Sequence, residues 1–397
     1  MFYVLGIIFL LLLWVSIDLK IGRFLFLRKS KRLLYPERFS SFELITEGHD
    51  LFKKFFDDIR NAKDHIHILI FIIRDDNISA EFLNLICLKS RQGVKVRILL
   101  DKVGGRDFTK DQIQMLNDNG VEFDYSNKPK WPLFFYSYNK RNHRKIFVID
   151  GEIGYIGGFN VGDEYLGLDE KLGFWRDYHL RMIGEGVQDL QKQFFVDWEM
   201  NTKTKINDNY LYYPKLKKLE SKHRLVPTEG AYLLHTVIEL VNKAEKELYI
   251  ATPYYVPGRK VNRAIISALK RGVKVVLLTP LRQDHKYVHE AAYIYYRRLM
   301  KHGCEIYFYK KGFIHAKVLV LDDNVCDVGT ANFDLRSLYS NNEINCIIED
   351  TEFSKVIRQA IEVDLEESMK VKKEHIKPKN FIEFAKEVIG YVLAPFL

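Results

Sequence analysis

The chain has 397 residues, of which 47% are hydrophobic and 28% charged, and its formal net charge is +9. This composition excludes a disordered or low-complexity chain, and the length suffices for two domains with separate cores. The positive charge favours polyanionic partners, either nucleic acid or an anionic membrane surface. The cysteines show neither zinc-ligand spacing nor a disulfide pattern, so we expect reduced, buried thiols.

The chain opens with an uninterrupted apolar run, MFYVLGIIFLLLLWVSI, which ends at Ile17. As a helix rising about 1.5 Å per residue, this run is near the lower limit for crossing a bilayer. Basic residues follow the run instead of preceding it: Lys20, Arg23, Arg28, Lys29, Lys31 and Arg32. This order disfavours a cleaved signal peptide and predicts a single-pass anchor over residues 1–19, with the remaining chain in the cytoplasm. Residues 20–47 are then expected to form a basic juxtamembrane linker.

Two stretches of the chain share one order of predicted elements: helix, strand, helix, strand. In the first stretch these elements cover residues 49–65, 66–74, 79–93 and 94–101; in the second they cover 231–247, 248–256, 260–272 and 273–280. Gly93 and Gly272 end the matching helices, as glycine often does. The alternation predicts an α/β fold with a mixed or parallel sheet in each half. We place the two domains at residues 48–205 and 206–379.

The segment NHRKIFVID (142–150) begins with His143 and Lys145, which should share one face of a strand because side chains alternate along it. Its end, at Asp150, reads as a hairpin turn. The segment FIHAKVLVLDD (313–323) repeats the pattern with His315, Lys317 and Asp322, and the offset is the same for each pair (315 − 143, 317 − 145 and 322 − 150). Asn160 and Asn332, which end the following Gly-rich turns, also have this offset. Such agreement indicates an internal duplication.

Two histidines, two lysines and two asparagines around one pocket would suit a phosphodiester substrate. Lysines and asparagines can bind the non-bridging oxygens and the charge that grows on them during transfer. One imidazole can attack phosphorus while the other protonates the departing alcohol. Asp150 and Asp322 lie at predicted turns, so a role in capping those turns fits them at least as well as chemistry.

Each imidazole also needs a partner that fixes its tautomer. Asp177 and Glu343 are the candidates, because both fall in apolar or aromatic surroundings where an unpaired carboxylate would be costly to bury. The alternative is that they pair with Arg176, Arg181 or Arg336. His65 with His67, and His285 with His289, have spacing seen in metal sites, but no carboxylate or cysteine cluster completes either set. We therefore predict no metal.

The repeated HxKxxxxD motif, with the segments GFWRDYHLR (173–181) and ATPYYVP (251–257), resembles the phospholipase D superfamily and, within it, bacterial cardiolipin synthases. The resemblance covers roughly residues 40–397. It implies two duplicated domains with the site at their pseudo-twofold interface, in a protein of the bacterial cell membrane. It also implies transfer of a phosphatidyl group from one phosphatidylglycerol to another through a phosphohistidine, without a cofactor or a nucleic-acid partner.

By position, the resemblance implies six catalytic residues and two phosphate-binding residues. The catalytic set is His143, Lys145, Asp150, His315, Lys317 and Asp322, and the phosphate-binding pair is Asn160 and Asn332. Within the superfamily, a hydrolase or a transferase that uses another alcohol is an alternative, because pocket shape sets the acceptor. A nuclease suits the basic charge but not the apolar N-terminus. A non-catalytic membrane-binding protein is disfavoured because both motifs are intact.

The C-terminal segment, residues 380–397, is predicted to be an amphipathic helix. Its apolar stripe comprises Phe381, Phe384, Ala385, Val388 and Val392. Two placements suit such a stripe: docking on the preceding domain, or lying at the membrane interface.

Overall fold

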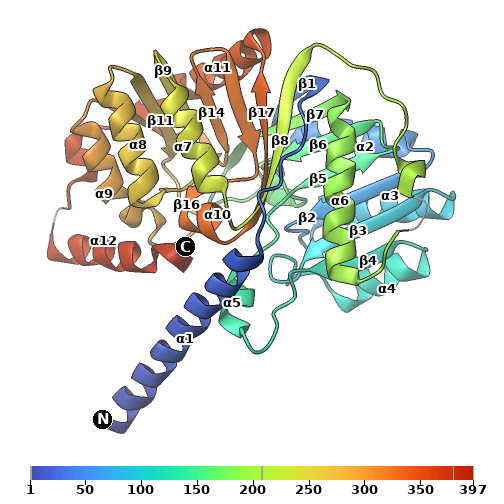
Figure 1. Cartoon of the computed structure of the whole chain (residues 1–397), viewed down its shortest axis with the longest axis horizontal. Coiled ribbons are helices and arrows are strands. Elements are labelled where there is room, and N and C mark those ends of the chain that lie inside the picture. The colour runs from blue at the N-terminus through green and yellow to red at the C-terminus, as the bar shows by residue number, and fades with distance from the viewer. Residues whose placement is uncertain (1, 207–208, 379, 397) are drawn as a thin grey trace.

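The computed structural model describes residues 2–206, 209–378 and 380–396 (Figure 1). Outside this part lie Met1, residues 207–208, residue 379 and Leu397. All of them fall at or near ends of the predicted domains. Apart from short 3-10 turns, the first half contains α1 (Phe2–Lys29), β1 (Arg38–Glu47), α2 (Gly48–Asn61), β2 (His65–Ile70), α3 (Asn77–Arg91), β3 (Lys95–Asp101), α4 (Lys110–Asp118), β4 (Glu122–Ser126), α5 (Phe134–Asn139), β5 (Ile146–Ile149), β6 (Ile153–Gly157), β7 (Phe174–Gly184) and α6 (Gly186–Thr202).

The second half begins at β8 and ends with the C-terminal helix. Its elements are β8 (Ser221–Glu229), α7 (Leu233–Lys243), β9 (Glu247–Ala251), β10 (Tyr255–Val256), α8 (Gly258–Lys270), β11 (Lys274–Pro280), α9 (Val288–Met300), β12 (Glu305–Tyr309), β13 (Gly312–Ile314), β14 (Val318–Leu321), β15 (Val325–Gly329), β16 (Phe333–Asp334), α10 (Leu335–Tyr339), β17 (Asn342–Glu349), α11 (Thr351–Glu366), β18 (Ser368–Lys370) and α12 (Phe381–Leu393).

Strand order repeats between the halves, as the duplicated motifs predict. The order β4-β3-β2-β5-β6-β7 in the first half matches β12-β11-β9-β14-β15-β17 in the second. In both sets the first three strands pair in parallel and the rest pair antiparallel. Gly93 and Gly272 follow the matching helices with φ of +95° and +93°, the left-handed conformation that glycine adopts without a steric penalty.

The two halves share one 16-stranded sheet instead of forming two separate sheets. Strand β1 joins them, because it pairs antiparallel with β7 of the first half and with β8 of the second. The expected linker over residues 20–47 is therefore wrong: α1 continues to Lys29, and Arg38–Glu47 is a strand. This strand carries serine, glutamate and arginine among its apolar residues, so its own sequence gives a weak strand signal, and pairing with both halves stabilises it.

Each half has its own apolar core, and a third core lies between them. The shared core takes residues from β5, β7, β15 and β17, among them Val148, Leu180, Val328 and Ile344, all 0% exposed. Strand β13 of the second half also pairs in parallel with β7 of the first. This continuity holds the two His–Lys motifs in a fixed relative position.

Helix α1 projects from the domain at its N-terminal end and packs on it further along (Figure 1). Trp14 stacks on Trp131 with ring centroids 6.0 Å apart, and buried Asp18 accepts the backbone N–H of Tyr136 at 2.7 Å. Within residues 2–206, 209–378 and 380–396, the structure contains no helix that combines the length and hydrophobicity of a membrane-spanning segment.

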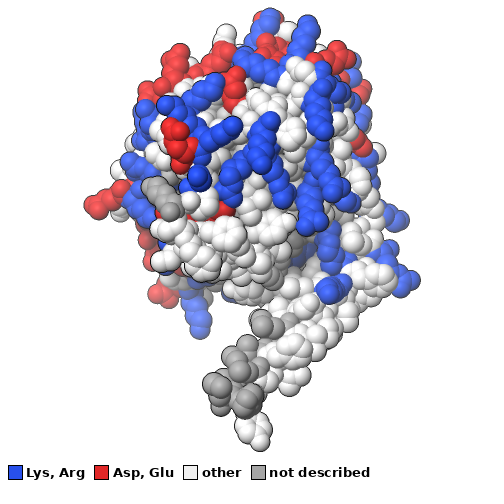
Figure 2. All heavy atoms as spheres, turned by 90° about the vertical axis from the view of Figure 1, so that its left-hand side faces the viewer, with Lys and Arg blue, Asp and Glu red and all other residues white. Residues whose placement is uncertain are grey.

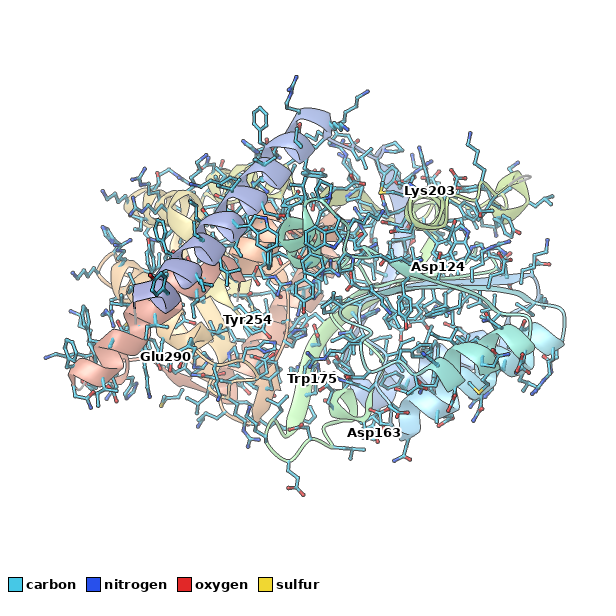
Figure 3. All side chains as sticks on the ribbon, turned by 90° about the horizontal axis from the view of Figure 1, so that it is seen from below. Asp124, Asp163, Trp175, Lys203, Tyr254 and Glu290 are labelled. Carbon is cyan, nitrogen blue, oxygen red and sulfur yellow. The ribbon has the colours of Figure 1, made fainter. Side chains whose placement is uncertain are left out.

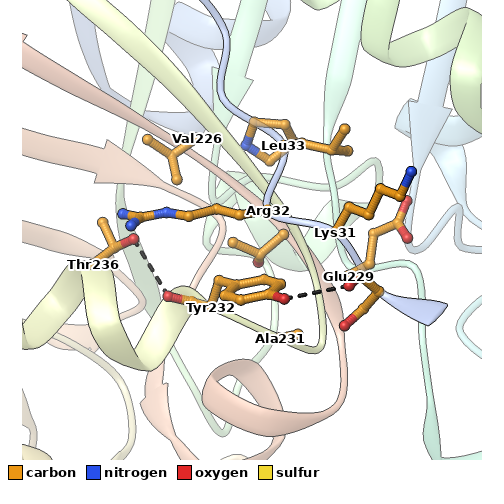
Figure 4. A pocket seen from close by; sticks show the side chains of 11 residues that line it. Lys31, Arg32, Leu33, Val226, Glu229, Ala231, Tyr232 and Thr236 are labelled. Atoms are coloured by element: carbon orange, nitrogen blue, oxygen red, sulfur yellow. Dashed lines mark hydrogen bonds between the residues drawn. The ribbon is translucent and has the colours of Figure 1, made fainter. Parts of the chain in front are cut away.

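The C-terminal end of α1 is fixed to the second half at a small recess (Figure 4). The Tyr232 hydroxyl donates to the Ser30 carbonyl at 3.3 Å, and the Tyr232 carbonyl accepts from Oγ1 of Thr236 at 3.4 Å. The enclosed volume is about 10 Å³, room for roughly one water molecule. The recess therefore joins α1 to the domain and is too small for an organic ligand.

Helix α12 forms as predicted and docks on α9 through the side opposite its apolar stripe. Glu387 pairs with Arg297 at 3.0 Å, and Gly390 packs against the backbone of Tyr287 and Ala291. The opposite face exposes large apolar side chains: Phe381, Ile382, Phe384, Val388, Ile389, Val392 and Leu393. The helix therefore docks on the domain, as one placement predicts, while its apolar stripe stays free.

Candidate active site

The two His–Lys motifs meet at a cavity of about 470 Å³ between the halves. The cavity is lined from both halves, and His143, His315, Asn160 and Asn332 are among the lining residues. Viewed from below, on the side where α1 and α12 lie, Trp175 and Tyr254 come from opposite halves near the centre of the molecule (Figure 3). Their rings contact that of His315, with centroids 5.1 Å and 6.3 Å away. The size suits a small ligand or a lipid headgroup.

Glu343 of the second half holds His143. Its two carboxylate oxygens lie 3.0 and 3.1 Å from Nδ1. Nε2 of the same ring lies 2.8 Å from Nζ of Lys145. Thr330 and Ser337 donate their hydroxyls to Glu343 at 2.6 and 2.8 Å, so the carboxylate itself is held in place. With Nδ1–H donated to Glu343, the lone pair of Nε2 is left as the reactive site.

Asp177 of the first half holds His315 in the same way. Its Oδ2 lies 2.8 Å from Nδ1 of the imidazole. Lys317 approaches that same nitrogen, with Nζ at 2.7 Å. The two lysines therefore contact different nitrogens of their histidines, and Nε2 of His315 is not engaged by its lysine. Each histidine is supported by a carboxylate from the opposite half, so neither half is a complete site alone.

Burial sets the charge state of the four central groups. It lowers the pKa of His143 to about 4, and it lowers the pKa of His315 well below its ordinary value. Burial and mutual repulsion lower the pKa of Lys145 to about 7, and burial lowers that of Lys317 to about 8. Burial also opposes ionisation of Glu343, yet the adjacent His143 and Lys145 hold its pKa below the ordinary value. The resting site thus holds a neutral His143 beside an ionised Glu343.

Asp150 and Asp322 do not line the cavity, although the resemblance groups them with the catalytic residues. Asp150 accepts three backbone N–H groups, from Lys63, Asp64 and His65, at 2.8–3.0 Å. Asp322 accepts the equivalent three, from residues 245–247, each at 2.8 Å. Both have left-handed backbones, with φ of +53° and +51°. The structure gives them the turn-capping role, which ties the motif strand to the start of its neighbour.

Asn160 and Asn332 line the cavity wall. Asn160 accepts the Ile72 N–H at 3.2 Å and donates to the Tyr165 hydroxyl at 3.0 Å. Asn332 donates to Asp334 at 3.1 Å, and its buried Oδ1 has no partner within the described part of the chain. The pair is therefore placed near the histidines but is not used identically in the two halves.

The alternative pairing of the two acids with nearby arginines is not seen. Arg176 pairs with Asp364 at 2.7 Å, and Arg181 pairs with Asp58 at 2.7 Å. Among residues 2–206, 209–378 and 380–396, no group of three His, Cys, Asp or Glu could hold a metal ion. His65 and His67 instead share Gln191, whose amide oxygen lies 3.1 and 3.0 Å from their rings.

Residue pattern alone did not single out several groups in the site. Arg141 is 1% exposed and pairs with Asp101 at 3.2 Å, and Arg144 binds both oxygens of Asp197 at 2.6 and 2.7 Å. Their position within the segment RNHRK, beside the motif histidine, was the available signal. These pairs fix the strand that carries His143.

Comparisons with known proteins agree with the geometry. The family model described as "Cardiolipin synthase, PLD-like domain" matches residues 55–198 and 237–365. A minor cardiolipin synthase of Bacillus subtilis (strain 168) is 40% identical over 383 residues, covering 96% of each chain. Cardiolipin synthase 1 of Staphylococcus epidermidis (strain ATCC 12228 / FDA PCI 1200) is 36% identical, covering 89% of this chain and 74% of its own.

Solved structures show the same fold at low sequence identity. Phosphatidylserine synthase from Haemophilus influenzae Rd KW20 superposes with a TM-score of 0.70 at 17% identity, covering 91% of this chain and 97% of its own. Polyphosphate kinase from Porphyromonas gingivalis gives a TM-score of 0.57 at 11% identity, over 84% of this chain and 49% of that one.

Proposed function

The chain belongs to the cardiolipin synthase family of phospholipase D-like proteins, and on this premise we propose how its residues carry out phosphatidyl transfer from one phosphatidylglycerol to another. The observation that supports the proposal is the pair of buried histidines, each held by a carboxylate from the opposite half of the chain. Such a pair suits a reaction with two chemically similar steps, because each step needs one base and one acid.

In the first step, Nε2 of neutral His143 attacks the phosphorus of the donor. A nitrogen–phosphorus bond forms and the bond from phosphorus to the glycerol oxygen breaks. His315 takes up a proton when the phosphodiester anion binds beside it, because the anion stabilises the imidazolium, and it gives this proton to the departing glycerol. Lys145 moves from Nε2 to a phosphoryl oxygen, and Lys317 stabilises the same developing charge with Asn160 and Asn332. Burial of these cations strengthens their attraction to the phosphate.

In the second step, the head-group hydroxyl of another phosphatidylglycerol attacks the phosphohistidine. His315 takes the hydroxyl proton, the new phosphorus–oxygen bond forms, and the bond to His143 breaks. Cardiolipin leaves and both imidazoles return to their starting states. Glu343 and Asp177 keep the tautomers fixed throughout.

The decisive experiment supplies the detergent-solubilised protein with phosphatidylglycerol alone and follows the lipid products. Cardiolipin and free glycerol in equal amounts are expected. Phosphatidic acid without cardiolipin would identify a hydrolase instead. DNA cleavage without lipid turnover would identify a nuclease.

We further propose that the protein works on the membrane surface through α1 and α12. The projecting part of α1 exposes Ile7, Phe9, Leu10 and Leu11, and α12 exposes its apolar stripe. Above α12, exposed basic side chains cover one face of the second half (Figure 2). They include Arg259, Lys260, Arg263, Lys270, Arg271, Arg298 and Lys301 on or beside α8 and α9. Apolar side chains below cations are typical of proteins bound to anionic lipid.

The proposed orientation keeps the catalytic domain in the cytoplasm, as the basic residues after the apolar run predict. Protease added outside intact cells should leave the domain whole, whereas the same protease should digest it after permeabilisation. Digestion in intact cells would overturn the orientation.

A further inference from the structure

The residues that line the active-site cavity differ between the two halves of the chain. Near His315, the lining includes the aromatic rings of Trp175 and Tyr254 together with the carboxylate of Asp284, which accepts the Tyr254 hydroxyl. The lining also includes two guanidinium groups that repel each other, those of Arg336 and of Arg141, which is two residues before His143. An anion bound in addition to the reacting phosphate is favoured beside these two guanidinium groups.

Arg336 lies next to the network that supports His143. Its carbonyl accepts the N–H of Asn341 at 2.8 Å, and Oδ1 of Asn341 accepts the N–H of Arg141 at 3.3 Å. The following residue, Ser337, donates its hydroxyl to Glu343 at 2.8 Å. Arg336 thus precedes a residue of the network that holds the attacking histidine, and its side chain lines the same cavity without joining that network.

No ion pair neutralises Arg336 within the part of the chain that the structure describes, although its charge partly offsets the rise that burial causes in the pKa of nearby Asp334. Arg141 pairs with Asp101 at 3.2 Å, whereas no ion pair or side-chain hydrogen bond joins Arg336 to residues 2–206, 209–378 or 380–396. Its Nε is buried and without a partner in the same part of the chain, as is Nε of Arg141. Asp334, the acid closest in sequence, uses its oxygens on Asn332 and on the Ser337 N–H. Burying part of a guanidinium without a hydrogen-bond partner lowers the stability of the protein, unless a bound ligand supplies that partner.

This cation also has no counterpart in the duplicated half. The offset between the two motifs places Glu164 at the equivalent position (336 − 164 equals 315 − 143), and Glu164 pairs with Arg74 at 3.0 Å. The two transfer steps use residues that the duplication supplies twice. Arg336 is present only once, so we expect it to serve a task that only one of the two substrates requires. Donor and acceptor are the two substrates that such a difference can distinguish.

We propose that Arg336, with the adjacent edge of Arg141, binds the phosphodiester of the acceptor lipid. The inference rests on the proposed phosphatidyl transfer and names the group that distinguishes its acceptor from water or a simple alcohol. In phosphatidylglycerol, three carbons separate the attacking hydroxyl from the phosphate, so the phosphate lies within one side-chain length of the reacting phosphorus. A planar guanidinium can donate two parallel hydrogen bonds to phosphate oxygens. Water and ethanol carry no group for it to bind.

The test compares two acceptors within one reaction mixture. Micelles of phosphatidylglycerol are incubated with ethanol, so that cardiolipin and phosphatidylethanol form from the same phosphoenzyme. For Arg336→Gln, the ratio of cardiolipin to phosphatidylethanol should fall about 10- to 100-fold, the range expected for one charge-assisted contact. Arg336→Lys should restore part of the ratio, because it keeps the charge but not the fork. The matched control is Arg106→Gln, which removes a cation at the exposed rim of the same cavity, where the side chain is 78% exposed; its ratio should stay that of the wild type.

The outcomes distinguish failure of the acceptor site at Arg336 from failure of the proposed phosphatidyl transfer. An unchanged ratio in Arg336→Gln, or an equal loss of both products, would overturn the acceptor role and assign Arg336 to folding or to the donor step. The thermal midpoint of each variant, measured in the same detergent, reports folding directly. Wild-type protein that makes phosphatidylethanol but no cardiolipin would instead reject phosphatidylglycerol as the acceptor.

Discussion

The carboxylate of Glu343 lies 3.0 Å from Nδ1 of His143, although the two residues belong to opposite halves of the chain. The reciprocal contact joins Asp177 of the first half to His315 of the second at 2.8 Å. The duplicated halves therefore exchange carboxylates, and a correct interface is required before either imidazole has a defined tautomer. This arrangement makes the interface part of the catalytic machinery.

Replacing Glu343 with glutamine should lower kcat by about 100-fold or more, because the amide no longer stabilises the tautomer or the charge on the ring. Loss of the carboxylate also removes the interaction that raises the pKa of His143. The acidic limb of the kcat/KM profile should consequently move to lower pH. An unchanged limb with normal activity would show that Glu343 does not orient this histidine. Circular dichroism of the variant separates this effect from misfolding.

The lowered lysine pKa values predict a loss of activity at alkaline pH. Lys145 and Lys317 have pKa values of about 7 and about 8, so raising the pH through this range discharges the groups that bind phosphate. Below it both lysines are charged, and the acidic limb should follow the protonation of His143 near pH 4. The profile of kcat/KM should thus be bell-shaped, since it reports groups of the free enzyme.

The lysines also influence each other. After burial, Lys317 is the largest cause of the lowered pKa of Lys145. In Lys317→Gln, the alkaline limb should therefore move to higher pH while the maximal rate falls. Lys171→Gln, at the exposed rim of the cavity, is the control and should leave the limb in place. A limb that does not move in Lys317→Gln would contradict the coupling.

Much of the site could be predicted because the duplication repeats it. The constant offset between the motifs identified both His–Lys pairs, and the cost of burying unpaired carboxylates pointed to Asp177 and Glu343. Which acid supports which histidine could not be predicted, because that depends on how the halves dock. Arg336 was weighed only as a partner for those acids, and comparing the repeats could not find it, because Glu164 occupies the equivalent position.

The fold was predicted where local patterns are strong and missed where pairing is non-local. The buried strands β2 and β9 read clearly as apolar runs, but β1 did not, since its Arg38–Glu47 segment is half polar. Its stability comes from strands β7 and β8, which are distant in sequence. The prediction of a separate sheet in each half failed for the same reason, because the pairing of β1 with both halves is also non-local.

Asp150 tests the distinction between a structural and a chemical role for the third residue of the motif. Asp150→Ala removes the acceptor of three backbone N–H groups and places alanine at a φ of +53°. We expect the free energy of unfolding to fall by about 1–3 kcal/mol. The kcat of the folded fraction should stay within a few-fold of wild type. Asp150→Asn is the control, because asparagine keeps an acceptor oxygen and tolerates this backbone. A stable Asp150→Ala protein with kcat reduced a thousandfold would favour direct chemistry.

The division of labour between the histidines gives the last prediction. By resemblance we assign His143 as the nucleophile and His315 as the acid and base, and either alanine variant should lose transfer by several orders of magnitude. The variants differ in the covalent intermediate. The His315→Ala variant cannot protonate glycerol, yet its His143 can still attack a donor that carries a good leaving group, so that donor should label His143. The His143→Ala variant should take no label. A phosphatidyl adduct on His315 in the intact enzyme, mapped by mass spectrometry, would reverse the assignment. This is the competing outcome to measure, because Lys317 contacts Nδ1 of His315 and not its Nε2.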